Sequence, residues 1–273
     1  MSLLSSGLDI VAQPVGCPPD DLLLFVASFD GVLTEYQDDP AHVRVTPARL
    51  ALLKCLQRLP GVVVAVISGR PLNDLRSRIP LDEDAYYIGL HGLEIAGPQF
   101  VQSCRERIHF YRDCMLDVAV RLDDVISDVP GVRVEYKGPI VALHTRETAP
   151  EQVVWSRFQL LSAAADLVNT ESVRSLRGHD VLELVPNVDC SRAEALRTVR
   201  RCVEARHHRA AFTVYIGEDI ADDDALSAVG ERGVAAVICR RTPVAHHLGS
   251  CDDLDALIDK LITSRVRRGD STG

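Results

Sequence analysis

The stretch that decides the fold is Leu22-Leu23-Leu24-Phe25-Val26-Ala27-Ser28-Phe29-Asp30-Gly31-Val32-Leu33-Thr34. Its continuous apolar run predicts a strand buried on both faces, as in a parallel sheet covered by helices. Ser28 and Asp30 are spaced i and i+2, so both side chains point to the same side at the end of this strand. Ligands of open α/β sheets bind at that edge, and Asp-Gly by itself is also a common turn.

The same pattern recurs along the chain and predicts an α/β fold. Short β-branched and aliphatic runs alternate with stretches of helical spacing. Thr46 before Pro47 fits a helix N-cap followed by proline in the first helical position. The predicted core strands are 22–27, 62–67, 86–88, 212–216 and 234–239, and helices are predicted over 47–59, 71–79 and 190–205.

Residues 98–184 have a different order of predicted helices and strands, which predicts an inserted α+β cap domain. A long helix over 105–128 precedes two strands, 132–136 and 140–145, which the short link Lys137-Gly138-Pro139 joins as an antiparallel hairpin. The parallel-sheet core domain is then made of 21–97 and 185–264. Residues 1–20 and 265–273 are expected to be a flexible lead and a flexible tail.

Composition excludes several classes of function. The chain has 273 residues, 47% apolar content, a net charge of -9 and a pI of about 5.5, which argues against nucleic-acid binding. Eight scattered cysteines without metal spacing suggest reduced thiols. No apolar run has the length of a membrane span or signal peptide, so we expect a cytoplasmic protein that does not bind membranes.

Two other predicted strands also end in polar groups. One ends in Ile67-Ser68-Gly69-Arg70-Pro71, and another ends in Gly217-Glu218-Asp219, with Asp222 close behind. Carboxylates, hydroxyls and backbone amides at neighbouring strand ends could converge on one phosphate group and one hard cation.

These three strand ends resemble, in order, the motifs of the haloacid dehalogenase superfamily. Further motifs resemble the trehalose-6-phosphate phosphatase family: Gly89-Leu90-His91-Gly92-Leu93-Glu94, Glu135-Tyr136-Lys137-Gly138, Leu143-His144-Thr145-Arg146 and Val181-Leu182-Glu183-Leu184. The resemblance extends over about residues 20–262 and implies a Rossmann-like core with a parallel sheet and an inserted cap.

The resemblance also implies roles for individual residues. Ser28 takes the position of the nucleophilic aspartate, Asp30 is the acid/base, and Mg²⁺ would be held by Asp30, Glu218 and Asp219. Phosphate would be bound by Ser68, Gly69, Arg70 and Arg192, although Cys190 is another candidate for the lysine position that Arg192 occupies. Substrate-binding positions are His91, Glu94, Glu135, Lys137, His144, Arg146 and Glu183, with a purely structural role equally open for His91.

Ser28 divides the functional prediction in two. The family reaction converts trehalose 6-phosphate and water to trehalose and phosphate. The neutral hydroxyl of Ser28 stands where the family has a carboxylate that is both the nucleophile and a metal ligand. We therefore expect impaired catalysis. The alternative is a pseudophosphatase, which catalyses no reaction. It would bind either a sugar phosphate or another enzyme of trehalose metabolism. Shifting the register so that Asp30 is the nucleophile is disfavoured, because Val32 would then take the acid/base position.

Overall fold

The computed structural model of the chain describes residues 21–35, 37, 42–98, 100–103, 105–178, 180–218, 222–238 and 246–269. It forms two compact units, the first made of Met1–Gln102 and Ser191–Gly273 and the second of Ser103–Cys190. The predicted lead, 1–20, lies outside the described residues. Helix α9 (Cys251–Gly269) extends into the stretch 265–273 that was expected to be a tail.

The first unit contains an eight-stranded sheet with the order β12-β11-β10-β1-β2-β3-β4-β5. Neighbours from β12 to β3 pair in parallel, and β4 is antiparallel to β3. The largely parallel α/β core predicted from the sequence is thus confirmed. The strands are β1 (Leu22–Ser28), β2 (Val62–Ile67), β3 (Tyr86–Gly89), β4 (Glu94–Gly97), β5 (Phe100–Ser103), β10 (Ala211–Gly217), β11 (Gly233–Ile238) and β12 (His246–Leu248).

Strand β1 lies at the point where the order of connections reverses. The chain passes from β1 to its neighbour β2 and returns later to β10 on the other side of β1. Ser28 is paired in register with Ile67, and Ala27 with Ile216, so the three strands end together. Such a switch point is where open α/β sheets bind ligands.

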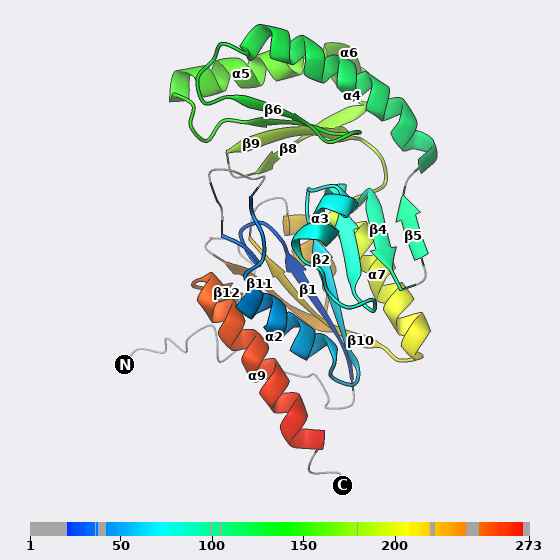
Figure 1. The fold of residues 1–273 in the computed structure, drawn as a ribbon. Helices are drawn as coiled ribbons and strands as arrows, with labels where there is room; N and C mark the ends of the chain where they lie inside the picture. The colour runs from blue at the N-terminus through cyan, green and yellow to red at the C-terminus, as the bar shows by residue number, and fades with distance from the viewer. Residues whose placement is uncertain are drawn as a thin grey trace. The chain divides into compact units, whose positions relative to one another are not determined.

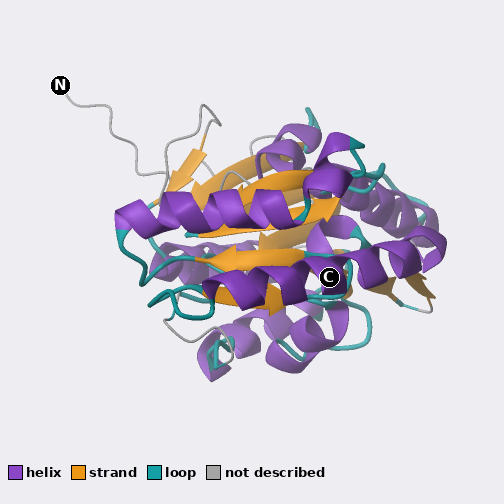
Figure 2. Cartoon of the chain, turned by 90° about the horizontal axis from the view of Figure 1, so that it is seen from above, coloured by secondary structure: helices purple, strands orange, loops and turns teal. Residues whose placement is uncertain are grey.

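Helices cover both faces of this sheet (Figure 1), and the view from above shows strands between helices (Figure 2). Leu23 and Phe25 face a cluster that includes α2 (Pro47–Gln57), α3 (Leu72–Arg78) and α9. The alternate positions Leu24 and Val26 face α7 (Arg192–His207) and α8 (Asp223–Ala228). As predicted, Thr46 caps α2, because its hydroxyl accepts the backbone N–H of Arg49 at 3.2 Å.

The second unit is a four-stranded antiparallel sheet with the order β6-β7-β9-β8. Apolar side chains of one sheet face pack against its helices and form a core with Met115, Leu122 and Leu160. The predicted hairpin is confirmed by the antiparallel pairing of β6 with β7. The elements are α4 (Arg105–Ile126), β6 (Arg133–Tyr136), β7 (Val141–His144), α5 (Pro150–Ala163), α6 (Ala165–Asn169), β8 (Val173–Gly178) and β9 (Val181–Pro186).

Within the described part of both units, no helix is long and apolar enough to cross a membrane.

Candidate active site at the strand ends

Ser28 lies at the buried C-terminal end of β1 and is tied to Asp222. Its side-chain oxygen Oγ donates a hydrogen bond to Oδ1 of Asp222 at 2.8 Å. Ser28 is 3% exposed and Asp222 is 1% exposed. The hydroxyl hydrogen of Ser28 is therefore directed at a carboxylate that comes from the segment after β10.

Asp222 accepts from four residues, of which Ser28 is one. Its Oδ1 also accepts the hydroxyl hydrogen of Tyr215 at 2.6 Å and is ion-paired with Nη1 of Arg192, while Oδ2 accepts the N–H of Glu218 at 3.0 Å. Burial by itself opposes ionisation of Asp222, but the charge of Arg192 and the three other donors outweigh it and lower its pKa. The ionised carboxylate of Asp222 is therefore a weak base.

Arg192 is held from the other side by His91. Its Nε and Nη2 atoms lie 3.2 and 3.1 Å from Nδ1 of His91. Because a guanidinium can only donate, Nδ1 accepts, and the ring of His91 carries its hydrogen on Nε2. Arg192 begins α7, which is capped by the hydroxyl of Ser191 accepting from the N–H of Glu194 at 3.3 Å.

A strained turn places His91. In the short 3₁₀ turn η1 (Leu90–Gly92) the φ angles of Leu90 and His91 are 47° and 56°, a region that side chains with a Cβ rarely adopt. The backbone N–H of His91 donates to the carbonyl of Ser68 at 3.1 Å. A Cβ on Gly69 would lie 2.5 Å from Nε2 of His91, so only glycine fits beside the ring.

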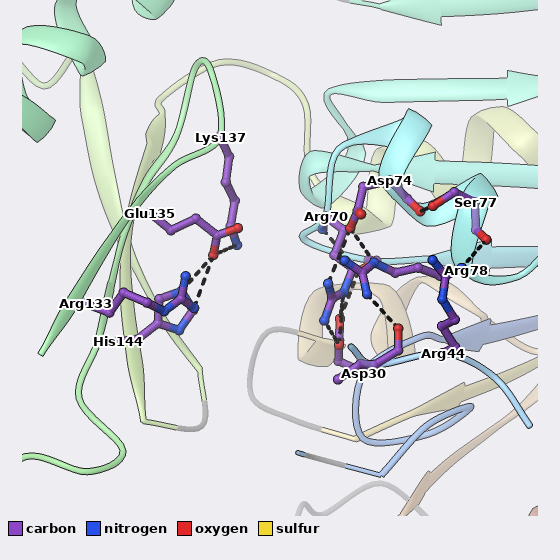
Figure 3. Close-up of polar contacts among 12 residues, drawn as sticks. Asp30, Arg44, Arg70, Asp74, Ser77, Arg78, Arg133, Glu135, Lys137 and His144 are labelled. Carbon is purple, nitrogen blue, oxygen red and sulfur yellow. Dashed lines mark hydrogen bonds and ion pairs between the residues drawn. The ribbon is translucent and has the colours of Figure 1, made fainter. Parts of the chain in front are cut away.

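Asp30 is bound by Arg70 and Ser68. Both carboxylate oxygens of Asp30 accept hydrogen bonds from Arg70, at 2.8 to 3.1 Å, and Oδ2 also accepts from the Ser68 hydroxyl at 3.2 Å. Figure 3 shows the guanidinium of Arg70 turned toward this carboxylate and toward Asp74, whose Oδ2 lies 3.3 Å from Nη1. Burial disfavours the charged guanidinium, but these carboxylates outweigh it and raise the pKa of Arg70.

A second polar cluster lies on the sheet of the second unit (Figure 3). Glu135 on β6 lies 2.8 Å from Nε2 of His144 on β7, and the ammonium of Lys137 lies 2.8 Å from Oε1 of Glu183 on β9. Lys137 and Arg133 each lie 3.8 Å from Glu135. Burial would raise the pKa of Glu135, but His144, Lys137 and Arg133 lower it to about 2.

The comparison with known proteins identifies the family. Residues 26–248 match the model of the trehalose-phosphatase family. The chain belongs to this family. The trehalose-phosphate phosphatase of Mycobacterium marinum is 31% identical over 238 residues, which are 87% of this chain and 59% of that protein. The trehalose-phosphate phosphatase of Mycobacterium ulcerans is 32% identical over 238 residues, again 87% of this chain and 59% of that protein. The chain thus spans about 59% of the length of these curated relatives.

Solved structures agree on the fold. A trehalose-6-phosphate phosphatase related protein superposes with a TM-score of 0.74 and 18% identity, over 90% of this chain and 99% of that chain. The C-terminal domain of a Candida albicans trehalose-6-phosphate phosphatase gives a TM-score of 0.75 at 17% identity, over 94% and 95%. A haloacid dehalogenase-like hydrolase from B. subtilis gives a TM-score of 0.53 at 14% identity, over 87% of this chain and 98% of that chain. At these identities the likeness shows the haloacid dehalogenase-like fold alone.

Phosphatases of this superfamily generally use Mg²⁺, so the donor set can be tested for fit. Of the three residues predicted as ligands, Asp30 is bound by Arg70, Glu218 packs against Gly31, and Asp219 lies outside the described residues. Ser28, at a position where the family has a carboxylate ligand, offers a neutral hydroxyl. Among the described residues no three His, Cys, Asp or Glu side chains gather as a metal site. Among the described residues, Ser28 is neutral and Asp30 and Asp222 are already paired with arginines, so these three side chains do not fit a magnesium site.

The structure brings most of the predicted residues of this trehalose-phosphatase family member into two groups. Ser28, Asp30, Ser68, Arg70, His91 and Arg192 lie at the strand ends of the first unit. Glu135, Lys137, His144 and Glu183 lie together on the second. Arg192, one of the two candidates for the lysine position, is ion-paired with Asp222.

Two predicted substrate residues have other contacts. Oε2 of Glu94 accepts the N–H of Leu72 at 2.8 Å and so caps α3, whose N-cap Pro71 makes no side-chain hydrogen bond. Nε of Arg146 lies 3.9 Å from Oδ2 of Asp180, with which it forms an ion pair. Sequence reasoning missed Tyr215, and it left Asp222 out of the predicted site residues. The only signal for Tyr215 is a hydroxyl within an apolar strand, two residues before Gly217.

Proposed function

We propose that this chain binds trehalose 6-phosphate and hydrolyses it very slowly. Family membership supports the substrate, and the polar clusters on the two units supply groups that suit phosphate and sugar hydroxyls. The observation that carries the slow hydrolysis is the hydrogen bond from Ser28 to Asp222. A hydroxyl that donates to a carboxylate must lose its proton before it can attack phosphorus, and aspartate in the same place needs no such step.

Among the described contacts of Ser28, no strong base is present that could take up its hydroxyl proton. Asp222 is the acceptor of its hydrogen bond, but the lowered pKa of Asp222 makes proton transfer to this carboxylate unfavourable. An ester formed on serine would also lack the easy hydrolysis of an acyl phosphate. From losses measured when other enzymes lack their nucleophile, we expect a rate lower by about 10⁴- to 10⁶-fold.

A non-catalytic regulatory role is the second candidate. One structural neighbour at a TM-score of 0.68 and 12% identity is the C-terminal domain of a Candida albicans trehalose synthase regulatory protein. This likeness in fold supports a regulatory role for the chain, and the serine at position 28 suits such a role. The partner would be an enzyme of trehalose metabolism.

Phosphate release from trehalose 6-phosphate with Mg²⁺ tests the proposal, comparing the native chain with Ser28→Asp, Asp30→Asn and a blank. We expect almost no release from the native chain and a gain in Ser28→Asp. Rapid release from the native chain that Asp30→Asn abolishes would show a working phosphatase. If Ser28→Asp stays silent, other changes in the site, such as Glu218 and Arg192, also prevent hydrolysis.

A further inference from the structure

We infer that the strand-end site of the first unit binds the phosphoryl group of its ligand without a divalent cation. This inference rests on the proposed function, because it concerns the same site and the same sugar phosphate. It concerns how charge is balanced around residues 28, 30 and 222, and it follows from the misfit between these residues and magnesium.

Position 28 carries a neutral side chain in this protein. A phosphate group that approaches a carboxylate at close range is repelled, and a bound cation is the usual way to offset this repulsion. Ser28 has no charge, and its Oγ donates a hydrogen bond. With serine at position 28 in place of the family's aspartate, the site lacks the negative charge nearest to the approaching phosphorus and has a hydrogen-bond donor there.

The two aspartates beside Ser28 are already paired with arginines. Asp30 is ion-paired with Arg70 at 2.8 Å, and Asp222 is ion-paired with Arg192. Both arginine side chains are largely buried, at 13% and 10% exposure, so water screens these pairs weakly. Glu218 is a further carboxylate, and it lies against Gly31. Protein cations thus already balance the two aspartates that flank Ser28.

Several side chains of the site can donate hydrogen bonds to a phosphate group. Ser28 and Ser68 each carry a hydroxyl hydrogen that can turn from its aspartate acceptor to a phosphate oxygen. The guanidinium of Arg192 lies next to Ser28, because both bind Oδ1 of Asp222. Arginine is suited to phosphate because its planar fork can donate two parallel hydrogen bonds. These donors belong to the chain and need no metal ion.

Calorimetric titration of the native chain with trehalose 6-phosphate tests the inference, once in EDTA and once in millimolar MgCl₂. Inorganic phosphate serves as a second probe of the phosphoryl site alone. We expect the dissociation constants with and without Mg²⁺ to agree within about threefold for each probe.

Two variants at one position isolate the charge. Ser28→Asp adds a carboxylate, and Ser28→Asn adds a side chain of nearly the same size without charge. We expect Ser28→Asp to bind trehalose 6-phosphate about tenfold more weakly in EDTA than in MgCl₂, and Ser28→Asn to show no such difference. If Ser28→Asp does not fold, the comparison in the native chain still decides.

The outcomes separate the inference from the proposed function. Binding to the native chain that appears only with Mg²⁺ would overturn the inference and leave the proposed function standing. Absence of binding in both buffers at millimolar ligand would overturn both. Equal binding in both buffers supports both.

Discussion

Tyr215 donates its hydroxyl hydrogen to Oδ1 of Asp222 across 2.6 Å, and both residues are fully buried. The same oxygen accepts the hydroxyl of Ser28. Burial and the neighbouring Asp222 charge raise the pKa of Tyr215 well above its usual value, so it stays a neutral donor. A tyrosine from β10 and a serine from β1 therefore share one carboxylate oxygen beside Arg192.

Tyr215→Phe should destabilise the protein by about 1–3 kcal/mol, because a buried carboxylate loses a donor while the ring volume is kept. Urea denaturation of the native chain and the variant measures this change. Tyr136→Phe is the matched control, because the Tyr136 hydroxyl donates to the carbonyl of Arg112 at 3.0 Å on an exposed side chain. The control should change the free energy of unfolding by less than about 0.5 kcal/mol. Equal losses in both variants would contradict a special role for Tyr215.

Arg192→Met should cost about 3–5 kcal/mol at neutral pH, because it leaves Asp222 buried without its cation. Arg192→Lys should lose less, because lysine keeps the charge but cannot bind Asp222 and His91 through one planar group. Arg197→Met, on an exposed arginine of the same helix, is the control and should cost less than about 1 kcal/mol. Thermal or urea unfolding ranks the four proteins, and similar losses for Arg192→Met and Arg197→Met would refute the argument.

The Arg192 variants also have a predictable pH dependence. The pKa of Asp222 is lowered below 3.8, so its stabilising contribution is present above that pH and is lost as the pH falls through the folded value. In Arg192→Met, burial without the guanidinium should raise this pKa, so Asp222 takes up a proton more readily on acidification. The difference in unfolding free energy between the native chain and Arg192→Met should then shrink as the pH falls through the raised pKa of Asp222 in the variant.

Much of the first unit could be predicted because its strands are continuous apolar runs. Those runs, together with the polar residues that follow Ile67 and Gly217, predict a candidate site at the ends of β1, β2 and β10. The edge strands β5 and β12 and the penultimate strand β4 were not predicted, since each is only three or four residues long and has little periodicity. Predicting the hairpin of β6 and β7 needed only the short link between two alternating segments.

The contacts of the site were less accessible to sequence reasoning. Asp30 was predicted to serve catalysis and metal binding, but its pairing with Arg70 depends on how the loops after β1 and β2 lie in space. Glu94 matches a family motif, and only the folded structure shows that its carboxylate caps α3. Which side chains share one buried acceptor is decided by packing between elements distant in the chain, so spacing within a motif carries no signal for it.

Glu135→Gln should lower stability at neutral pH and have less effect in acid. The pKa of Glu135 is lowered from 4.5 to about 2, so the ionised side chain stabilises the fold above pH 4.5, and this contribution is lost as the pH falls toward 2. We expect about 1 kcal/mol at pH 7, because a third of the side chain is exposed and water screens the interaction.

Urea denaturation at neutral pH and near pH 3 measures the effect of Glu135→Gln. Glu147→Gln, at an exposed position, is the control for the loss of one carboxylate. The destabilisation by Glu135→Gln should be clearly smaller in acid, while the effect of the control stays small at both values. An effect of Glu135→Gln that is the same at both pH values would contradict the interaction with His144 and Lys137.

Gly31→Ala should destabilise the protein more than Gly230→Ala, although both residues adopt a left-handed backbone. Their φ angles are 77° and 71°, so the backbone strain from an added Cβ is similar, about 1–2 kcal/mol. The Cβ on Gly31 would lie 2.6 Å from Cδ of Glu218, whereas a Cβ on Gly230 meets nothing within 4 Å. We expect roughly 1 kcal/mol of additional loss in Gly31→Ala, because Glu218 must move.

Glu218→Ala provides the decisive comparison, because it removes the atoms that an added Cβ at position 31 would meet. In this background Gly31→Ala should cost no more than Gly230→Ala, and urea denaturation of the single and double variants measures the coupling. If the additional loss persists without the Glu218 side chain, the added Cβ clashes with another group. If it disappears, the side chain of Glu218 is what leaves room only for glycine at position 31, next to Asp30.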